Sequence, residues 1–222
     1  MERYAYELCR FKDTCKEIYV SFMGDMISGG IHYTARIEER ENVVDQVIGA
    51  AELCANFLYI LSSNFETVYV NNVNGNHSRV ERSAEDAIRG ERLDVLIPWF
   101  CKARLAEQKN IFFKDREADA TITSFTIFDK LYVAIHGDYD ADIQKSAIAL
   151  QRLFGKKIDY ILSAHMHVPE MRIEETGFIR NGCVCGPGDD YTIRKRLFGV
   201  PSQVALLCGE KGVEAVYPIV LN

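Results

Sequence analysis

The order of patterns along this sequence predicts a layered α/β fold. Short apolar strands alternate with helical stretches, polar loops follow the strands, and the last third is a series of short strands separated by glycine-rich turns. Alternating strands and helices followed by a β-rich tail indicate a sandwich of sheets flanked by helices. We expect one domain over residues 1–222, because a chain of 222 residues forms one substantial core and leaves little for a second.

The elements follow from the spacing of apolar residues. Helical spacing predicts helices over residues 3–16, 43–61, 84–107 and 143–154. Short apolar runs predict strands over residues 18–23, 67–73, 111–113, 122–128, 131–135, 159–163, 171–174, 178–180, 204–208 and 213–218. Asp129-Lys130 is expected to turn the hairpin between the fourth and fifth of these strands.

Composition and charge narrow the class of protein. A formal charge of −6 argues against broad wrapping of nucleic acid, although a nuclease can still neutralise a single phosphate with metal ions. The seven cysteines are scattered and odd in number, which is not a disulfide framework and fits a reducing cytoplasm. We find no secretory signal and no run of roughly 20 apolar residues, so we expect no membrane segment.

Polar residues gather in loops that follow strands. His77, His136, His165 and His167 each come after an apolar run, and Asp25 and Asn76 lie in loops of the same kind. Such loops usually hold the ligands of an α/β sheet, so we expect these side chains to converge. Carboxylate, amide and imidazole ligands suit manganese, iron, zinc or nickel better than calcium or magnesium.

Four short motifs point to a family. Gly24-Asp25, Gly75-Asn76-His77, His136-Gly137-Asp138 and His165-Met166-His167, in this order, resemble four of the five motifs of calcineurin-like metallophosphoesterases. The text GDMISGGIH, VNGNHSR and GPGDDY is similar to a subgroup encoded by bacteriophages and described as DNA repair exonuclease-like phosphoesterases. The resemblance implies that family's β-sandwich flanked by helices. Relative to it, the chain is N-terminally truncated and misses the first strand, which carries an Asp-x-His motif.

The resemblance implies a role for each matching residue. One metal would be bound by Asp25, Asn76, His136 and His165, which makes one complete and tight site. A second metal would share Asp25 and use His167, and would be weak because its other protein ligands come from Asp-x-His. Manganese is the metal that we expect, with zinc, iron or nickel as alternatives.

Catalysis in the family depends on water activated by the metals. The residue matching His77 positions the phosphate and protonates the leaving oxygen, so we expect His77 and the metal-bridging Asp25 to be catalytic. His32 and Arg79 are candidates for binding the substrate, although His32 could equally be a solvated surface residue and Arg79 could equally form a surface salt bridge. Asp138 could orient a metal ligand or belong to a turn.

Two functions remain open. The first is a metal-dependent phosphodiesterase or nuclease that hydrolyses a phosphate ester, working with one metal or with Asp-x-His from a separate N-terminal fragment. The second is a non-catalytic or split-protein subunit that serves binding or assembly. In both cases a partner, either that fragment or a second copy in a homodimer, is expected to cover the sheet edge. We expect a cytoplasmic location, in the host cell if a phage encodes the protein.

Overall fold

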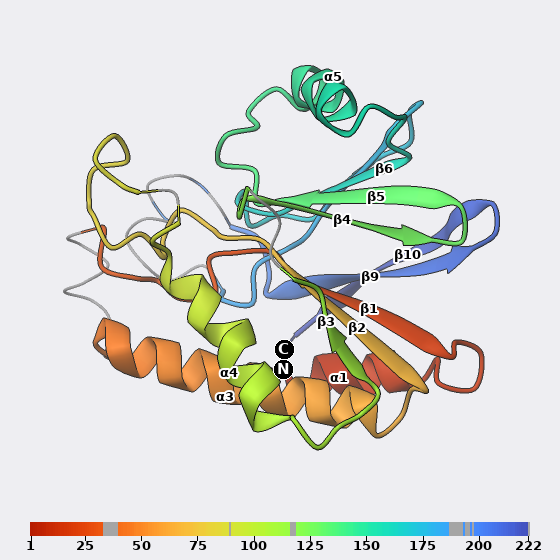
Figure 1. Cartoon of the computed structure of the whole chain (residues 1–222), viewed down its shortest axis with the longest axis horizontal. Coiled ribbons are helices and arrows are strands. Elements are labelled where there is room, and N and C mark those ends of the chain that lie inside the picture. The colour runs from red at the N-terminus through yellow and green to blue at the C-terminus, as the bar shows by residue number, and fades with distance from the viewer. Residues whose placement is uncertain are drawn as a thin grey trace.

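The chain folds into stacked layers of sheets and helices (Figure 1). This computed structural model describes residues 1–32, 40–88, 90–115, 119–186, 193, 196 and 198–221. Most of the GPGDDY segment, from Pro187 to Tyr191, therefore lies outside the described residues. The predicted α/β layered architecture is confirmed, with two sheets face to face and helices on their outer sides.

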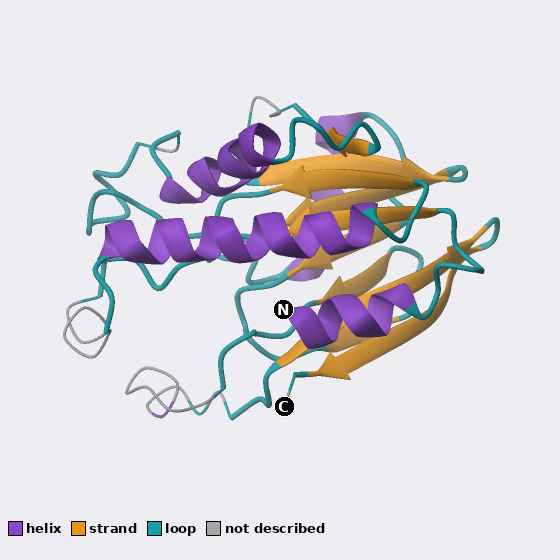
Figure 2. Cartoon of the chain, turned by 90° about the horizontal axis from the view of Figure 1, so that it is seen from below, coloured by secondary structure: helices purple, strands orange, loops and turns teal. Residues whose placement is uncertain are grey.

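The first layer pair is built on a parallel sheet. Its strands β1 (Glu17–Phe22), β2 (Thr67–Asn72) and β3 (Ile111–Phe113) pair in that order. The helices α1 (Glu2–Cys9), α3 (Val43–Ser62) and α4 (Leu96–Arg104) cover the outer face of this sheet, as Figure 1 labels them and as Figure 2 shows from below. Fully buried Leu58, Leu61, Val68 and Ile97 form the centre of the core between these helices and the sheet.

The second layer pair is a mixed sheet covered by one helix. Strands β4 (Ile122–Ile127), β5 (Lys130–Ile135), β6 (Tyr160–Ser163), β8 (Gly177–Arg180) and β7 (Glu170–Arg172) pair in this spatial order. Helix α5 (Ile143–Phe154) packs its Leu150 onto Val133, Ile135 and Ile161 of the outer face. The sheet thereby presents its other face to β1 and β2.

A hairpin of β9 (Ser202–Gly209) and β10 (Gly212–Val220) closes the chain. It packs on α1, where the Tyr4 hydroxyl donates to the carbonyl of Val204 at 3.0 Å, and on the turn after α1, where Phe11 contacts Tyr217. Among the described strands, β1 pairs only with β2 and β9 only with β10. β1 and β9 therefore each have one edge that pairs with no other described strand.

The strand directions position the site. β1 and β2 are parallel to one another, and so are β5 and β6. The loops that follow these four strands carry Asp25, the segment from Asn76 to His77, His136 and His165 respectively. The polar loops of the two sheets therefore meet at one end of the sandwich.

Two predicted helices are shorter than expected. The helix predicted over residues 3–16 ends at Cys9 and continues as turns. The prediction of one helix over 84–107 is wrong, because turns and the 3₁₀ helix η1 (Leu93–Val95) precede α4. Pro98 explains this start: inside a longer helix its ring would clash with the carbonyl of Asp94, whereas the first turn tolerates it.

The hairpin turn is Phe128-Asp129, one residue earlier than predicted, and Lys130 already begins β5. The other predicted helices and strands are confirmed, with small shifts at their ends.

Helix α3 is the one described helix that could cross a membrane, judged by length and composition alone, which is weak evidence against the expectation of no membrane segment. The most apolar 18 residues of Val43–Ser62 have a mean hydropathy of 1.3, and 28% of them are buried. In this structure the helix lies against the parallel sheet, with Ala51, Cys54 and Leu58 in the core. Core helices of soluble proteins can have the same length and apolar composition.

Candidate metal centre

Two glycines bring the loops after β1 and β2 into contact. A Cβ on Gly24 would lie 2.5 Å from the backbone nitrogen of Gly75, and a Cβ on Gly75 would lie 2.1 Å from Asp25 Oδ1. Gly24 also has a φ of +78°, which side-chain-bearing residues rarely adopt. Only glycine at both positions therefore lets the Asp25 loop and the Asn76 loop touch.

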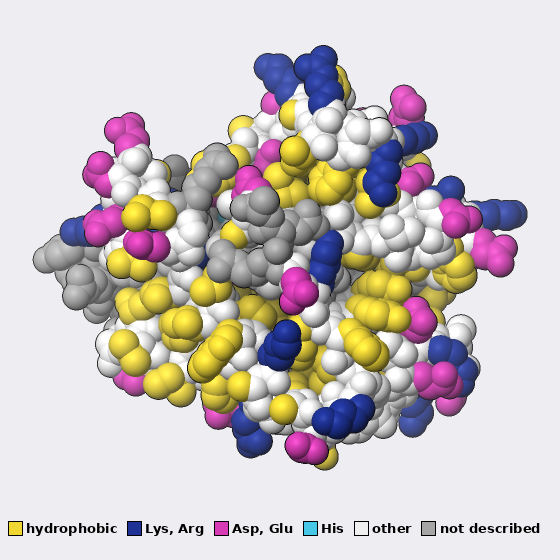
Figure 3. Space-filling model, viewed as in Figure 1, with side chains coloured by type: hydrophobic (Ala, Val, Ile, Leu, Met, Phe, Trp, Pro, Cys, Tyr) yellow, Lys and Arg dark blue, Asp and Glu magenta, His cyan; other side chains and the backbone are white. Residues whose placement is uncertain are grey.

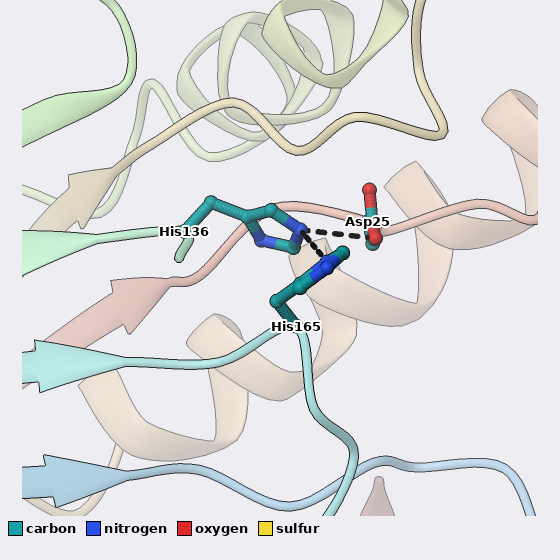
Figure 4. A group of neighbouring side chains, drawn as sticks. All are labelled: Asp25, His136 and His165. Carbon is teal, nitrogen blue, oxygen red and sulfur yellow. Dashed lines mark hydrogen bonds and ion pairs between the residues drawn. The ribbon is translucent and has the colours of Figure 1, made fainter. Parts of the chain in front are cut away.

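Polar atoms from three loops converge on the ring of His136, and Figure 4 shows two of these side chains, Asp25 and His165, beside it. The ligand atoms of Asp25, His136 and His165 all lie within 4.8 Å of one another. His136 Nε2 is 3.0 Å from Asp25 Oδ2, 3.1 Å from Asn76 Oδ1 and 3.3 Å from His165 Nδ1. The structure thus brings together the four residues of the predicted complete site.

The tautomer of His136 decides what this cluster can bind. Its Nδ1 lies 2.7 Å from the carbonyl of Met23, which can only accept, so Nδ1 carries a proton and donates it. In the neutral ring Nε2 then offers a lone pair toward the lone pairs of Asp25, Asn76 and His165. Lone-pair atoms brought this close to one another fit a divalent cation, and imidazole held by a carbonyl in this way is typical of metal ligands.

Ionisation of the metal-free cluster follows from the same contacts. Burial alone would raise the pKa of Asp25, but the hydrogen bond and charge of His136 outweigh it and lower the pKa to about 2. Burial alone would lower the pKa of His136, but Asp25 raises it to about 9. Burial, together with the charge of His136, lowers the pKa of His165 to about 4. A cation would therefore replace a proton on His136 and meet a neutral His165.

Three of the predicted ligands have left-handed backbone. The φ angles of Asp25, His165 and His167 are +50°, +64° and +60°. For residues other than glycine this conformation costs on the order of 1–3 kcal/mol each, and it is concentrated at functional sites. The backbone is thus strained where the candidate ligands lie.

Asp94 belongs to the site although the sequence patterns did not indicate it. Its carboxylate is buried and accepts backbone N–H groups of Asp25, Met26 and Gly75. Burial raises its pKa, opposed by the hydrogen bond from Gly75. The position was concealed inside the predicted helix 84–107. The sequence held two signals: Pro98, which interrupts the predicted helix, and an aspartate within an otherwise apolar segment.

His77 lies beside the cluster and not within it. Its backbone N–H donates to Asp25 Oδ1 at 2.8 Å, and its ring Nδ1 lies 3.0 Å from the carbonyl of Ser28. The ring of His32 is 5.0 Å from that of His77. Burial lowers the pKa of His32, and the charges of His77 and Arg79 lower it further. His32 therefore lies near His77, Arg79 and Asp25.

Arg79, His167 and Asp138 have less defined surroundings. Arg79 Nη2 donates to the carbonyl of Arg82 at 3.3 Å. His167 is half-buried and near enough for its charge to lower the pKa of His165, but it is not part of the group around His136. Burial raises the pKa of Asp138, and the charge of His136 opposes that rise.

The chain was compared with known proteins by sequence and by structure. No family model matches it, and no curated protein is similar to it. An archaeal phosphodiesterase is similar in structure at 14% identity and a TM-score of 0.42, over 92% of this chain and 99% of that one. A mutant of Vps29 from Entamoeba histolytica is similar at 12% identity and 0.42, over 93% and 99%. A predicted phosphoesterase from Streptococcus pneumoniae is similar at 11% identity and 0.38, over 92% and 97%.

Proposed function

We propose that this protein is a metal-dependent phosphoesterase of the calcineurin-like class, acting on phosphodiesters. The observation that carries the proposal is the convergence of Asp25, Asn76 and His165 on His136 Nε2, at 3.0, 3.1 and 3.3 Å. The buried Asp25 Oδ2 has no hydrogen-bond donor other than that ring nitrogen among the described residues. A divalent cation satisfies all of these atoms at once, and the motif order supplies the link to phosphate esters.

A bound cation, which we propose to be manganese, would act as the Lewis acid that lets water attack phosphorus at neutral pH. Asp25, Asn76, His136 and His165 would hold it. Zinc, iron or nickel would suit the same donor set.

His77 is proposed to protonate the leaving oxygen. The carbonyl of Ser28 holds Nδ1 at 3.0 Å, so the ring would deliver its proton through Nε2. The backbone of His77 is tied to Asp25 Oδ1, which keeps the acid at a fixed place beside the metal ligands.

His32 and Arg79 are proposed to bind the phosphate. His32 lies close enough to both His77 and Arg79 for their charges to affect its pKa, so these three side chains would form a group that can bind an anionic substrate. Arginine binds phosphate oxygens in pairs, which suits a phosphodiester such as nucleic acid.

A second metal would need ligands beyond Asp25 and His167. We propose that a strand bearing Asp-x-His, on a preceding or separate N-terminal segment, pairs along the edge of β1 that has no partner among the described strands. Such a strand would end beside Asp25, since β1 leads directly to that residue. Pairing would also cover exposed backbone groups.

The test is hydrolysis of bis(p-nitrophenyl) phosphate with increasing manganese, for the chain alone and with an Asp-x-His strand supplied as a peptide or fusion. His77→Asn should keep metal binding and lower turnover about 100-fold or more, the usual contribution of a general acid. Parallel loss of metal and turnover in that variant would make His77 a ligand. If neither the chain alone nor the chain with the added strand hydrolysed the substrate although metal was bound, the proposed enzymatic function would be contradicted.

A binding subunit is the second candidate, and an exposed apolar face favours it. Figure 3 shows hydrophobic side chains gathered over α3 and α4. Val44, Ile48, Leu53, Tyr59 and Trp99 are each at least half exposed there. Such a face is typical of a surface that contacts another protein. Sedimentation of the wild type and of Trp99→Ser would show whether the chain associates with itself through this face.

A further inference from the structure

One carboxylate accepts hydrogen bonds from both loops of the candidate metal centre. Asp94 is 2% exposed. Its Oδ2 lies 2.8 Å from the backbone nitrogen of Gly75 and 3.2 Å from that of Asp25, and its Oδ1 lies 3.3 Å from that of Met26. Both oxygens are thus engaged by backbone donors, and Asp94 is not among the grouped candidate ligands Asp25, His136 and His165.

The loops need such an acceptor because of how closely they pack. The contact between Gly24 and Gly75 places the N–H groups of Asp25 and Gly75 side by side, pointing in one direction. Neither could turn to solvent without separating the loops. Buried N–H groups without an acceptor are costly, and a carboxylate accepts several at once.

Asp94 is itself held by rigid neighbours. The backbone N–H of Leu93 donates to the carbonyl of Ser78 at 2.8 Å, which ties η1 to the loop after Gly75. Ile97 and Cys101 of α4 are fully buried in the core under the parallel sheet. Because η1 leads directly into α4, the Asp94 carboxylate links the two loops to a helix that is fixed in the core.

We propose that Asp94 is a positioning residue of the metal centre. Asp94 itself binds no metal, but it holds Asp25 and Asn76 at the separation that the cation requires. The inference rests on the proposed function. Without Asp94 the fold can persist, because the core lies elsewhere, but Asp25 and Asn76 would lose their fixed spacing. Residues that orient metal ligands in this way typically contribute about 10–100-fold in metal affinity.

The experiment compares Asp94→Ala and Asp94→Asn with wild type and with a matched control. Asp94→Ala removes the three backbone hydrogen bonds, together with the side-chain hydrogen bond from Ser78, and should raise the Kd for manganese about 10–100-fold. In Asp94→Asn the side chain has the same shape as aspartate and keeps one oxygen, so the Kd should lie between those of wild type and Asp94→Ala. The control is Asp159→Asn, because Asp159 Oδ2 accepts the N–H of Leu131 at 2.8 Å at the other end of the sheet.

The readouts are the Kd for manganese by calorimetry and the visible absorption of bound Co²⁺, which reports ligand geometry and not stability. We expect the absorption to change in both Asp94 variants and to stay constant in Asp159→Asn. If Asp94→Ala does not fold, Asp94→Asn decides. Folded Asp94 variants with wild-type Kd and wild-type absorption would overturn the inference and leave the proposed function intact. A wild-type chain that binds neither ion would overturn the metal centre itself.

Discussion

The two ends of the sandwich interior are built by opposite means. Every second residue, Tyr132 and Ala134 on β5 and then His136 just after it, lies on the inner face, and together they lead from one end to the other. At one end Phe125, Tyr132 and Tyr160 stack with centroids 5.5 and 4.8 Å apart. At the other, lone-pair atoms face one another and the backbone is left-handed at several ligands.

This difference separates stability from function. The aromatic end contributes free energy of folding by burying large rings, which needs no ligand. The metal end costs free energy in the metal-free chain, because its backbone is strained and its converging lone pairs repel one another unless a proton or a cation lies between them. Substitutions at one end should therefore affect folding, and substitutions at the other should affect binding.

The largest effect on folding is expected from Tyr132→Ala. Tyr132 is 1% exposed and contacts the rings of both neighbouring strands. Deleting such a ring should lower the free energy of unfolding by about 3–5 kcal/mol. Urea denaturation measures it, and the folded fraction should still bind manganese with wild-type stoichiometry. A loss of bound metal with an unchanged midpoint of urea denaturation would contradict the assignment of stability to the aromatic end and of binding to the metal end.

The next effect is the stabilisation by manganese, which should depend on His136. At a free manganese concentration of about 100 times Kd, binding raises the free energy of unfolding by about 2.7 kcal/mol. His136→Ala should abolish this increase, because it removes the central ligand atom. The comparison is the shift in melting temperature on adding manganese, with EDTA as the reference for each variant. An equal shift in both proteins would place the metal elsewhere.

The sequence predicted the apolar elements well and the connections between them less well. Val43–Ser62 and Ile143–Phe154 form where apolar periodicity is strong, since burial of one face decides their structure. The site residues Asp25, Asn76, His136 and His165 were indicated by motifs after strands. Asp94 was not, because its role depends on a contact with Gly75, distant in sequence, and on Pro98 interrupting an apparent helix.

A smaller effect on folding, with a large one on binding, is expected from Gly75→Ala. The new Cβ would lie 2.1 Å from Asp25 Oδ1, so the ligand must move. Overpacking of this kind costs about 1–3 kcal/mol, and the Kd for manganese should rise at least tenfold. Gly49→Ala in α3 is the control, with nothing within 4 Å of the added atom. A wild-type Kd in Gly75→Ala would show that the two loops can separate without affecting the site.

The smallest effect is expected from Tyr132→Phe, which tests the aromatic end atom by atom. The Tyr132 hydroxyl lies 3.4 Å from Cys208 Sγ on β9, a weak acceptor. Removing the hydroxyl leaves the stacked rings in place, so the free energy of unfolding should fall by only about 0.5–1.5 kcal/mol. Burial raises the pKa of that hydroxyl well above its ordinary value, so the hydroxyl is neutral and no charge is lost with it. The measurement is urea denaturation beside Tyr132→Ala. A loss as large as that of the alanine variant would mean that the contact with β9, and not ring stacking, stabilises this end.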